Sequence, residues 1–327
     1  MIQISILTLK RAVLAAITDA HDVFTYTNSL LKQMGRPELF RISLIGLGED
    51  VQLSDGLFTI KPDGKIYDEQ RHDLIIIPPM SGDMIGATYL NKVYAGWIAK
   101  QYKNGAEVAS FCVGAFLLAF SGLLKNKQCS THWDYANEFR SYYPAVHLVE
   151  DKIFTADKGL YSSGGNNAYW SLLLYLIEKF TDRQIAIQVA KQFVVDINKV
   201  NQTPFVVFKG YKKHDDELIK EIQTFIEQNF TDKLTVSDLA EKYHIVRRTF
   251  ERRFLKATHL TVAEYIQRIK IEAAKKLLET GRRSVTEVMV AVGYMDTQSF
   301  RDAFKKVTDL TPVAYRDKYN IPPTGLP

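Results

Sequence analysis

The sequence predicts two domains of different class: an α/β domain with a doubly wound, mostly parallel sheet, and then an all-α domain. Over the first part of the chain, short apolar runs alternate with helical stretches, which favours a sheet covered by helices on both faces. In the last third, a pattern of helix, short turn and helix occurs twice at a spacing of 49 to 50 residues. The 327 residues are 46% hydrophobic and 24% charged, which is ordinary for a water-soluble chain of two or three domains.

Apolar and β-branched stretches mark the strands expected in the first domain. They occupy 2–9, 40–47, 74–77, 107–111, 153–155 and 160–163, and helices are expected at 13–34, 90–104, 114–124 and 169–180. The stretch 50–68 is broken by Gly56, Pro62 and Gly64, which predicts an edge hairpin.

A further helix is predicted over residues 182–199. Its apolar residues fall on more than one face, so we expect it to be either buried or shared between its own domain and a partner. The first helix of the last domain is expected at 215–230. These patterns predict an α/β domain at 1–200, a linker at 201–214 and an all-α domain at 215–320.

Cys112 lies where a predicted strand passes directly into a predicted helix. A strand, a nucleophilic residue and then a helix is the order of a nucleophile elbow, which holds the side chain at the carboxyl edge of the sheet. The amino terminus of the helix would favour a thiolate or a bound anion. The alternative is that Cys112 is a small, buried core residue.

The two repeated units of the last domain each consist of two helices joined by a tight turn. Their matching residues are Phe250, Phe254, Lys256, Thr258, Leu260, Thr261 and Tyr265 in the first copy and Phe300, Phe304, Lys306, Thr308, Leu310, Thr311 and Tyr315 in the second. The spacing changes by one residue, and we place this change in the turn. Gly293 is expected to supply the second turn, and Asp296 to cap the helix that follows.

The second helix of each unit carries side chains suited to reading base pairs. Arginine can bind guanine through two hydrogen bonds and glutamine can bind adenine, so such helices fit the major groove, about one turn of DNA apart (~34 Å). One copy alone would be an ordinary helical hairpin with a solvated face, but two copies favour DNA binding. The predicted DNA-binding residues are Arg247, Arg248, Glu251 and Arg252 in the first unit and Thr297, Gln298 and Arg301 in the second, with Lys270, Lys305 and Lys306 as weaker phosphate contacts.

This domain resembles the DNA-binding domain of the AraC/XylS family, which implies a sequence-specific transcriptional regulator. The resemblance rests on Leu239-Ala240, 248–254, 273–278, Val292-Gly293-Tyr294, Ser299-Phe300, 304–306, Thr311-Pro312 and Tyr315-Arg316. The sequence departs from the family at His244 and Val246, where the family favours glycine and a capping serine. We therefore expect the first turn to be less well capped.

The first domain resembles the PfpI-type, class I glutamine amidotransferase-like domain, in the version fused to AraC-type domains in GlxA-family regulators. The resemblance rests on 112–119, Gly122-Leu123-Leu124 and Ser130-Thr131-His132-Trp133, and it implies a flavodoxin-like fold. Hydrolytic members often place histidine directly after the cysteine and glutamate on the first helix, but these positions are Val113 and Ala16 here. The resemblance therefore implies a sensor domain that also dimerises, without catalytic residues.

A concave elbow without a catalytic partner is suited to holding a small molecule. The predicted ligand-binding residues are Ser81, Gly82, Cys112, Thr131, His132 and Trp133. Two alternatives stay open. Cys112 could carry a hydrolase or amidase activity, with His132 in place of the absent base, or the domain could serve only for dimerisation.

Charge and cysteine content indicate the partners and the compartment. The net charge is +5, and 21 Lys/Arg against 17 Asp/Glu from residue 212 onward account for +4 of it, with Arg247, Arg248, Arg252 and Arg253 clustered on one helix. Two cysteines without metal-ligand spacing suit the reducing cytoplasm, and no segment resembles a targeting or membrane-spanning sequence. The expected partners are double-stranded DNA, a second copy in a homodimer and a small-molecule effector, with RNA polymerase left open; no cofactor, metal or membrane is expected.

Overall fold

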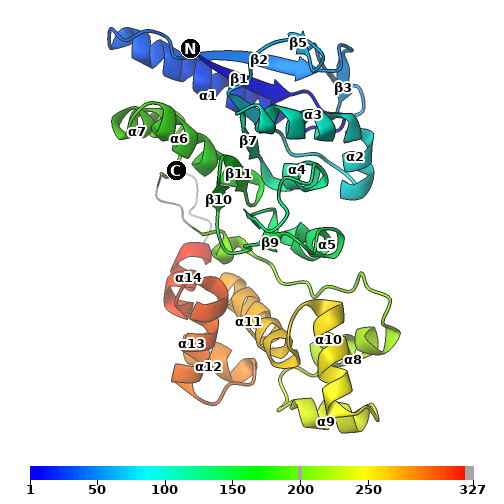
Figure 1. Ribbon diagram of the computed structural model, residues 1–327. Helices are drawn as coiled ribbons and strands as arrows, with labels where there is room; N and C mark the ends of the chain where they lie inside the picture. The colour runs from blue at the N-terminus through cyan, green and yellow to red at the C-terminus, as the bar shows by residue number, and fades with distance from the viewer. Residues whose placement is uncertain (198–200, 321–327) are drawn as a thin grey trace. The chain divides into compact units, whose positions relative to one another are not determined.

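The computed structural model describes residues 1–197 and 201–320, and its contacts divide the chain into two compact units (Figure 1). The first unit is Met1–Gln202 and the second is Thr203–Pro327. The first is built around a mostly parallel sheet with helices, and the described part of the second contains helices. The predicted fold class is therefore confirmed.

A seven-stranded sheet forms the centre of the first unit, in the order β10-β11-β7-β6-β1-β2-β5. Its strands are β1 (Ile2–Leu7), β2 (Phe40–Gly46), β5 (Gly64–Lys65), β6 (Leu74–Ile77), β7 (Glu107–Ser110), β10 (Phe154–Asp157) and β11 (Leu160–Ser163). All neighbours pair in parallel except β10, which is antiparallel to β11. The carboxyl ends of the parallel strands therefore meet at one edge, where ligands bind in doubly wound sheets.

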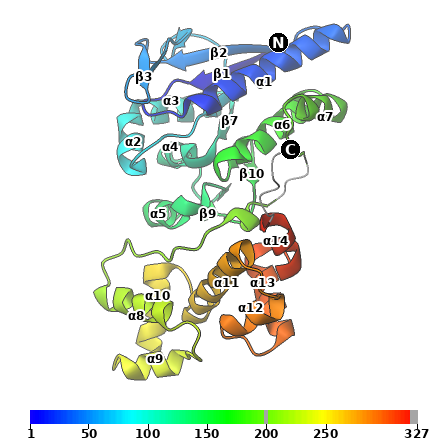
Figure 2. The same cartoon turned by 180° about the vertical axis from the view of Figure 1, so that it is seen from behind.

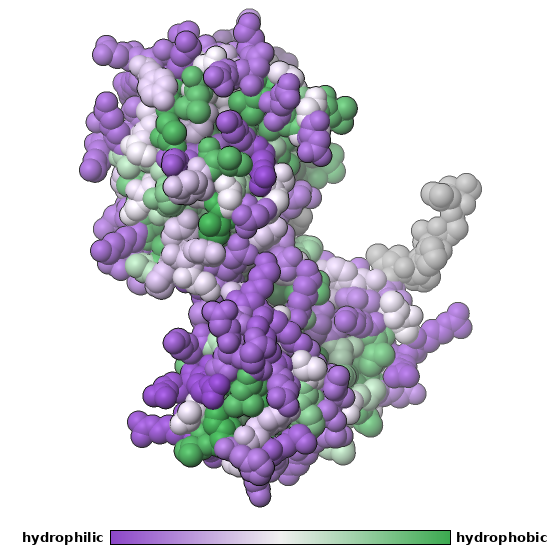
Figure 3. Space-filling model, turned by 90° about the vertical axis from the view of Figure 1, so that its right-hand side faces the viewer, coloured by the Kyte–Doolittle hydropathy of each residue, from purple (hydrophilic) through white to green (hydrophobic). Residues whose placement is uncertain are grey.

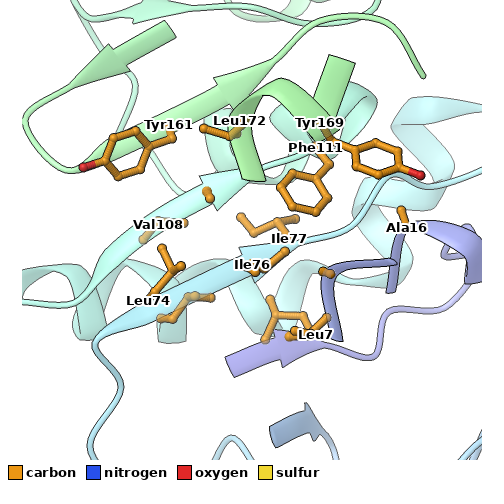
Figure 4. Close-up of a cluster of buried hydrophobic side chains, with 14 of the residues drawn as sticks. Leu7, Ala16, Leu74, Ile76, Ile77, Val108, Phe111, Tyr161, Tyr169 and Leu172 are labelled. Atoms are coloured by element: carbon orange, nitrogen blue, oxygen red, sulfur yellow. The ribbon is translucent and has the colours of Figure 1, made fainter. Parts of the chain in front are cut away.

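Helices cover both faces of this sheet (Figures 1 and 2). One group comprises α1 (Leu14–Gln33), α6 (Tyr169–Phe180) and α7 (Arg183–Gln192), and the other comprises α2 (Met84–Leu90), α3 (Lys92–Lys103) and α4 (Ala115–Phe120). The core between sheet and helices is apolar, with Leu7, Ile76 and Leu172 fully buried (Figure 4). All four residues of β6 are buried, which explains why this strand is a continuous apolar run in the sequence.

Several predicted helices differ from the observed ones. The helix expected at 90–104 begins at Lys92, and α2, which precedes it, was not predicted. The helix expected at 114–124 is only six residues long and follows a 3-10 turn at Cys112–Gly114. The hairpin expected at 50–68 is present as β3 (Val51–Leu53) and β4 (Phe58–Ile60). The short elements β8 (Gln128–Cys129), β9 (His147–Leu148) and α5 (Ala136–Tyr142) were not predicted, because such lengths show no clear periodicity.

The helix predicted at 182–199 is shorter than expected. Asp182 caps it by accepting a hydrogen bond from the backbone N–H of Ile185 at 3.0 Å, and α7 ends at Gln192. Val194 then adopts a left-handed φ of 55° and is 91% exposed. The buried residues of α7 lie on one face and are Ile185, Ala186, Val189 and Ala190. The predicted length of this helix is therefore wrong, and residues 198 and 199 lie outside the described residues.

Seven α-helices make up the described part of the second unit. They are α8 (Glu217–Gln228), α9 (Val236–Lys242), α10 (Arg247–Thr258), α11 (Val262–Thr280), α12 (Val285–Ala291), α13 (Thr297–Thr308) and α14 (Pro312–Tyr319). One apolar core joins α9 and α10, a second joins α12 and α13, and α11 contributes side chains to both. The unit thus contains two helix-turn-helix units connected by a single helix, as predicted.

Residues of the predicted linker make contacts with the second unit. Lys275 of α11 donates a hydrogen bond to the carbonyl oxygen of Val206 at 2.5 Å, and Glu272 accepts one from the backbone N–H of Phe208 at 3.1 Å. Lys275 and Glu272 also pair with each other at 2.8 Å, with only 5% and 11% of their side chains exposed. A buried ion pair of this kind needs further polar partners, and the backbone of 206–208 supplies them. This stretch is therefore anchored to α11.

Candidate nucleic-acid interface and cysteine elbow

The first helix-turn-helix unit combines a well-capped helix with a poorly capped turn. At the start of α9, the Thr235 hydroxyl accepts from the N–H of Asp238 at 3.1 Å, and the Asp238 carboxylate accepts from the N–H of Thr235 at 3.3 Å. In the turn, His244 adopts a left-handed φ of 50°, which is unfavourable for a residue with a Cβ. Val246 precedes α10 and has no side chain that could cap it. The weak capping expected at His244 and Val246 is confirmed.

Helix α10 has one apolar and one charged face. Phe250 and Phe254 are fully buried, with their ring centroids 5.7 Å apart. The four predicted DNA-binding residues of this unit are all exposed: Arg247, Arg248, Glu251 and Arg252. Arg247 pairs with Glu251 one turn along the helix at 3.1 Å, so each of these two side chains restrains the other.

Arg253 has a structural role that its neighbours lack. Its guanidinium donates two hydrogen bonds to the carboxylate of Asp216, at 2.9 and 2.6 Å. Asp216 in turn caps α8 by accepting from the N–H of Ile219 at 3.2 Å. The hydrogen bonds from Arg253 hold the pKa of Asp216 below its ordinary value. Arg253, which the sequence places in one basic cluster with Arg252, therefore ties α10 to α8 instead of adding a free charge.

The second helix-turn-helix unit has the same order of elements with better capping. Ser284 and Glu287 form a capping box at the start of α12. Gly293 takes the left-handed turn with a φ of 77°, and Asp296 caps α13 by accepting from the N–H of Ser299 at 2.6 Å. The roles predicted for Gly293 and Asp296 are both confirmed.

Helix α13 repeats the division between an apolar and a polar face. Phe300 and Phe304 are fully buried, and their ring centroids lie 5.8 Å apart. The predicted DNA-binding residues of this unit are exposed: Thr297, Gln298 and Arg301. Gln298 donates a hydrogen bond to Asp302 at 2.9 Å, which occupies one of the two N–H donors of its amide group.

The arginines predicted to read bases keep unshared charges. Among the residues that the structure describes, Arg248, Arg252 and Arg301 form no ion pair with a carboxylate. Lys305 and Lys306 are also exposed. In the view of Figure 3, hydrophilic residues surround apolar patches on the described part of Thr203–Pro327. Unpaired guanidinium groups on an exposed helix can bind phosphates or base edges without first breaking an internal contact.

Helix α11 connects the two helix-turn-helix units. It is 19 residues long, which corresponds to about 28 Å. Lys270, a predicted phosphate contact on this helix, donates to the carbonyl oxygen of Gly293 at 3.2 Å. Lys270 is half-buried, and this burial lowers the pKa of its ammonium group. In this structure Lys270 supports the second turn.

Cys112 lies at the carboxyl end of β7 in the strained turn that the sequence predicts. Its φ is 53°, in the left-handed region that a residue with a Cβ rarely adopts. The N–H of Cys112 donates to the Ser163 hydroxyl at 3.0 Å, and the Thr131 hydroxyl donates to the carbonyl oxygen of Cys112 at 3.1 Å. A Cβ on Gly114 would lie 2.8 Å from the carbonyl oxygen of Ile77, so this close approach requires glycine. The elbow geometry is confirmed.

Burial opposes ionisation of the Cys112 thiol. The residue is 4% exposed, and burial raises the pKa of the thiol to about 12. The helix behind it has only six residues, so its dipole offers little compensation for this desolvation. The expectation of a thiolate is therefore wrong. Ala16, at the position where hydrolytic relatives carry a glutamate, is fully buried, so a methyl group fills that place.

His132 and Trp133 follow Thr131 on the same loop. The Nδ1 atom of His132 accepts a hydrogen bond from the backbone N–H of Asp134 at 3.1 Å. Because Nδ1 is an acceptor, the neutral ring carries its proton on Nε2, so Nε2 is not a base. The rings of His132 and Trp133 lie 5.0 Å apart, measured between centroids. The imidazole of His132 and the indole of Trp133 therefore follow directly after Thr131, whose hydroxyl binds the backbone of Cys112.

Ser81 and Gly82 lie against the loop that follows β1. The N–H of Ser81 donates to the carbonyl oxygen of Arg11 at 2.8 Å. A Cβ on Gly82 would lie 3.3 Å from Nη1 of Arg11, so the guanidinium group lies close to this glycine. Arg11 was not predicted as a site residue, because its contact with Ser81 joins positions that are 70 residues apart.

Gln202 is a second residue of this region that was not predicted. It is 3% exposed, and its Nε2 donates to the carbonyl oxygens of Thr131 at 3.2 Å and Glu150 at 2.7 Å. Its Oε1 accepts from the N–H of Gly165 at 2.7 Å. The amide thus holds the loop that bears Thr131, and a lone glutamine 71 residues further along the chain carries no sequence signal for this role.

Two negative findings concern the described ranges 1–197 and 201–320. Within them, every helix is too short or too polar to cross a lipid bilayer. The same ranges contain no group of three or more His, Cys, Asp and Glu side chains that is arranged to hold a metal ion.

Comparison with known proteins identifies both units. Residues 10–179 match the DJ-1/PfpI family, and residues 239–318 match a helix-turn-helix domain. The HTH-type transcriptional regulator GbdR of Pseudomonas aeruginosa is 26% identical over 300 residues, which cover 91% of this chain and 80% of GbdR. The HTH-type transcriptional regulator GlxA of Rhizobium meliloti is 24% identical over 217 residues, which cover 65% of either chain.

A solved structure has the fold of the first unit. It is a putative transcriptional regulator protein from Vibrio parahaemolyticus, with a TM-score of 0.52 and 16% identity, and the match covers 59% of this chain and 98% of that one. At this identity the likeness shows the fold alone. The family match to 10–179 extends over more than half of the chain. The chain belongs to the DJ-1/PfpI family, and it joins this domain to an AraC-type helix-turn-helix domain, as the sequence predicts for a regulator of the GlxA type.

Proposed function

We propose that this protein is a sequence-specific DNA-binding transcriptional regulator that a small molecule controls through its DJ-1/PfpI domain. The observation that carries the proposal is the repeated exposed helix: α10 and α13 bury their phenylalanines and direct Arg248, Arg252, Gln298 and Arg301 to solvent. Guanidinium and amide groups of this kind bind base edges in the major groove, with the two helices about one turn of DNA apart (~34 Å). GbdR and GlxA are named as transcriptional regulators, which supports the same role here.

Genome-wide mapping of bound DNA, followed by affinity measurements on a recovered site, tests this proposal. Arg252→Ala should weaken binding by roughly 1–3 kcal/mol and relax specificity at one base pair, because its charge is exposed and unpaired. Lys191→Ala on α7 removes the same charge outside the helical unit and should leave the affinity unchanged. If Arg252→Ala binds the recovered site as tightly as the parent does, Arg252 reads no base.

In this proposal the DJ-1/PfpI domain is a sensor and not an enzyme. The raised pKa of the buried Cys112 thiol supports this role, because the thiolate is the reactive form of cysteine. The hydrogen bond that Nδ1 of His132 accepts from the backbone also supports it, because it leaves Nε2 protonated and unable to act as a base. Cys112→Ser should therefore preserve DNA binding. An amidase activity that is measured in the parent and lost in this variant would favour an enzyme instead.

A cytoplasmic homodimer is the proposed form of the protein. This part of the proposal rests on the likeness to GlxA-type regulators, since the apolar face of α7 packs within its own unit. Sedimentation at micromolar concentration distinguishes a dimer from a monomer. A regulator bound at a promoter is also placed to contact RNA polymerase, which crosslinking on the recovered site would detect.

A further inference from the structure

The structure assigns a second small-molecule site to the first unit, separate from the cysteine elbow. We propose that it binds a small dipolar molecule, with an anionic group at Lys10 and Arg11 and a cationic group at Glu49 and Asp50. The site is a pocket of about 440 Å³, which these four residues help to line. Known small-molecule sites range from roughly 300 to 1,000 Å³. The inference rests on the proposed function, because it locates the effector of the regulator.

The pocket lies at the carboxyl ends of two neighbouring parallel strands. Thr8 directly follows β1, Leu47 directly follows β2, and both line the pocket. This is the edge at which doubly wound sheets bind ligands, because the loops after the strands diverge there. The pocket is lined neither by Cys112 nor by the loop of His132. The pocket therefore lies at the ends of β1 and β2, whereas the elbow lies at the end of β7.

Buried polar residues help to line this pocket. Tyr94 is 2% exposed, and its hydroxyl donates to the carbonyl oxygen of Thr8 at 3.1 Å. The same hydroxyl interacts with the backbone of Leu47, so one side chain meets the ends of both strands. Burial raises the pKa of Tyr94 to about 12, which keeps the hydroxyl neutral. Leu47, Val51 and Leu90 add apolar surface to the same pocket.

The basic side of the pocket is held in position by Asn91. This residue is 1% exposed, and its side chain accepts from the N–H of Lys10 at 2.9 Å and donates to the carbonyl oxygen of Lys10 at 3.0 Å. Arg11, the next residue, has a left-handed φ of 63°. Strain of this kind persists only where the surroundings impose it, and it is concentrated at functional sites. Lys10 and Arg11 are thus presented by a backbone that is ordered before a ligand arrives.

The charges of the pocket do not neutralise one another. Among the described residues, Lys10, Arg11, Glu49 and Asp50 take part in no ion pair. A simple anion would gain from the basic pair but be repelled by the acidic pair, and a simple cation would meet the reverse. A molecule that carries both charges can form charge-assisted hydrogen bonds to both groups. The lining therefore selects for a dipolar ligand.

Arg11 also connects the pocket with the loop after β6. Its carbonyl oxygen accepts from the N–H of Ser81, and its guanidinium group lies near Gly82. Two residues that the sequence predicts as ligand contacts therefore adjoin the basic side of this pocket. A ligand that binds Arg11 therefore contacts a residue that is hydrogen-bonded to the loop after β6.

Calorimetry on the full chain with 6-aminohexanoate as the dipolar probe tests the proposal. Hexanoate and hexylammonium serve as matched probes that carry one charge each. The structure predicts binding of 6-aminohexanoate and at least about tenfold weaker binding of the other two, because each loses one set of charge-assisted hydrogen bonds. Equal binding of all three probes, or binding of none, would overturn the proposal.

Variants locate the probe and separate this proposal from the proposed function. Lys10→Gln and Glu49→Gln should each reduce the affinity about tenfold, whereas Lys103→Gln at the exposed end of α3 should not. Unchanged affinity in both pocket variants would place the probe elsewhere and refute the site. Affinity for a recovered DNA site is measured separately without the probe. If the parent binds the probe but no DNA, the regulator proposal fails while the pocket stands; if it binds DNA but no probe, the reverse holds.

Discussion

The two helix-turn-helix units bury equivalent side chains but close their turns differently. In each unit a tyrosine hydroxyl donates to a glutamate at 2.6 Å, from Tyr265 to Glu227 in the first and from Tyr315 to Glu279 in the second. Helices α10 and α13 also both end at a left-handed residue with φ near 60°. The two copies therefore share this tyrosine–glutamate contact and the form of their helix ends, and they differ in their turns.

The first turn comprises residues 243–246 and the second comprises 292–296, so the second holds one more residue, as predicted. Ile245 and Tyr294 pack against their respective cores, which leaves Met295 as the added residue, 91% exposed. The first turn places His244 where the second has a glycine, and it also lacks the cap that Asp296 supplies. The fold of the unit thus depends on its core, while the turn adjusts its stability.

Gly293→Ala should have the largest effect. A Cβ there would lie 2.3 Å from the carbonyl oxygen of Thr231 and 2.9 Å from Nζ of Lys270, at a φ of 77°. The free energy of unfolding of the second helix-turn-helix unit should fall by roughly 3 kcal/mol, since both strain and a backbone clash are introduced. His244→Ala is the matched control, because a Cβ is already present at that position. Hydrogen exchange of the α12 and α13 amides measures the effect, and equal protection in both variants would refute this account of the turns.

Arg253→Ala should destabilise the first helix-turn-helix unit by about 1 kcal/mol, since a partly exposed ion pair contributes little more. The second helix-turn-helix unit has Ala303 at the equivalent position and lacks this contact. Arg253 lowers the pKa of Asp216, so the contribution of the pair is complete above the ordinary value of 3.8 and is lost as the pH falls through the lowered pKa. Urea unfolding at pH 7 and pH 3 should show a smaller difference between parent and variant at pH 3. A difference that does not depend on pH would mean that Asp216 is not the group involved.

Changes to the caps should bring the two units closer together in stability. Asp296→Ala removes the acceptor for the N–H of Ser299 and should cost about 1 kcal/mol. Val246→Asp introduces such an acceptor before α10 and should gain up to about 1 kcal/mol. Hydrogen exchange in the first turn of each helix reports both changes. No added protection at the start of α10 in Val246→Asp would show that the turn geometry prevents capping there.

His244→Gly should have the smallest effect. Glycine adopts the left-handed backbone without strain, but it also increases the entropy of the unfolded chain, so the net gain should stay below about 1 kcal/mol. The midpoint of thermal unfolding measures this change, and hydrogen exchange of the α9 and α10 amides assigns it to the first helix-turn-helix unit. A lower midpoint would indicate that the imidazole makes stabilising contacts that offset its backbone strain.

Local patterns were sufficient for much of the fold and for the exposed faces of α10 and α13. The strand at 74–77 and the helix at 169–180 were predicted to the residue, because a buried strand is a continuous apolar run and α6 has a strong apolar face. Gly293 and Asp296 were also assigned correctly, since a left-handed turn and a helix cap are properties of single residues. The exposed set on α10 and α13 follows from the spacing of the phenylalanines on each helix.

Residue patterns were insufficient wherever the answer depended on partners distant in the chain. Arg252 and Arg253 are adjacent and identical, yet Asp216, 37 residues away, makes Arg253 structural. The state of the Cys112 thiol likewise depends on burial by surrounding segments, which outweighs the short helix behind it. The pocket that carries Lys10 and Glu49 exists because parallel strands bring the loops after them to one edge. The order of residues alone thus established the repeat, its caps and its exposed faces, whereas folding in three dimensions set the charges and the pockets, because desolvation and ion pairing act through space and not along the chain.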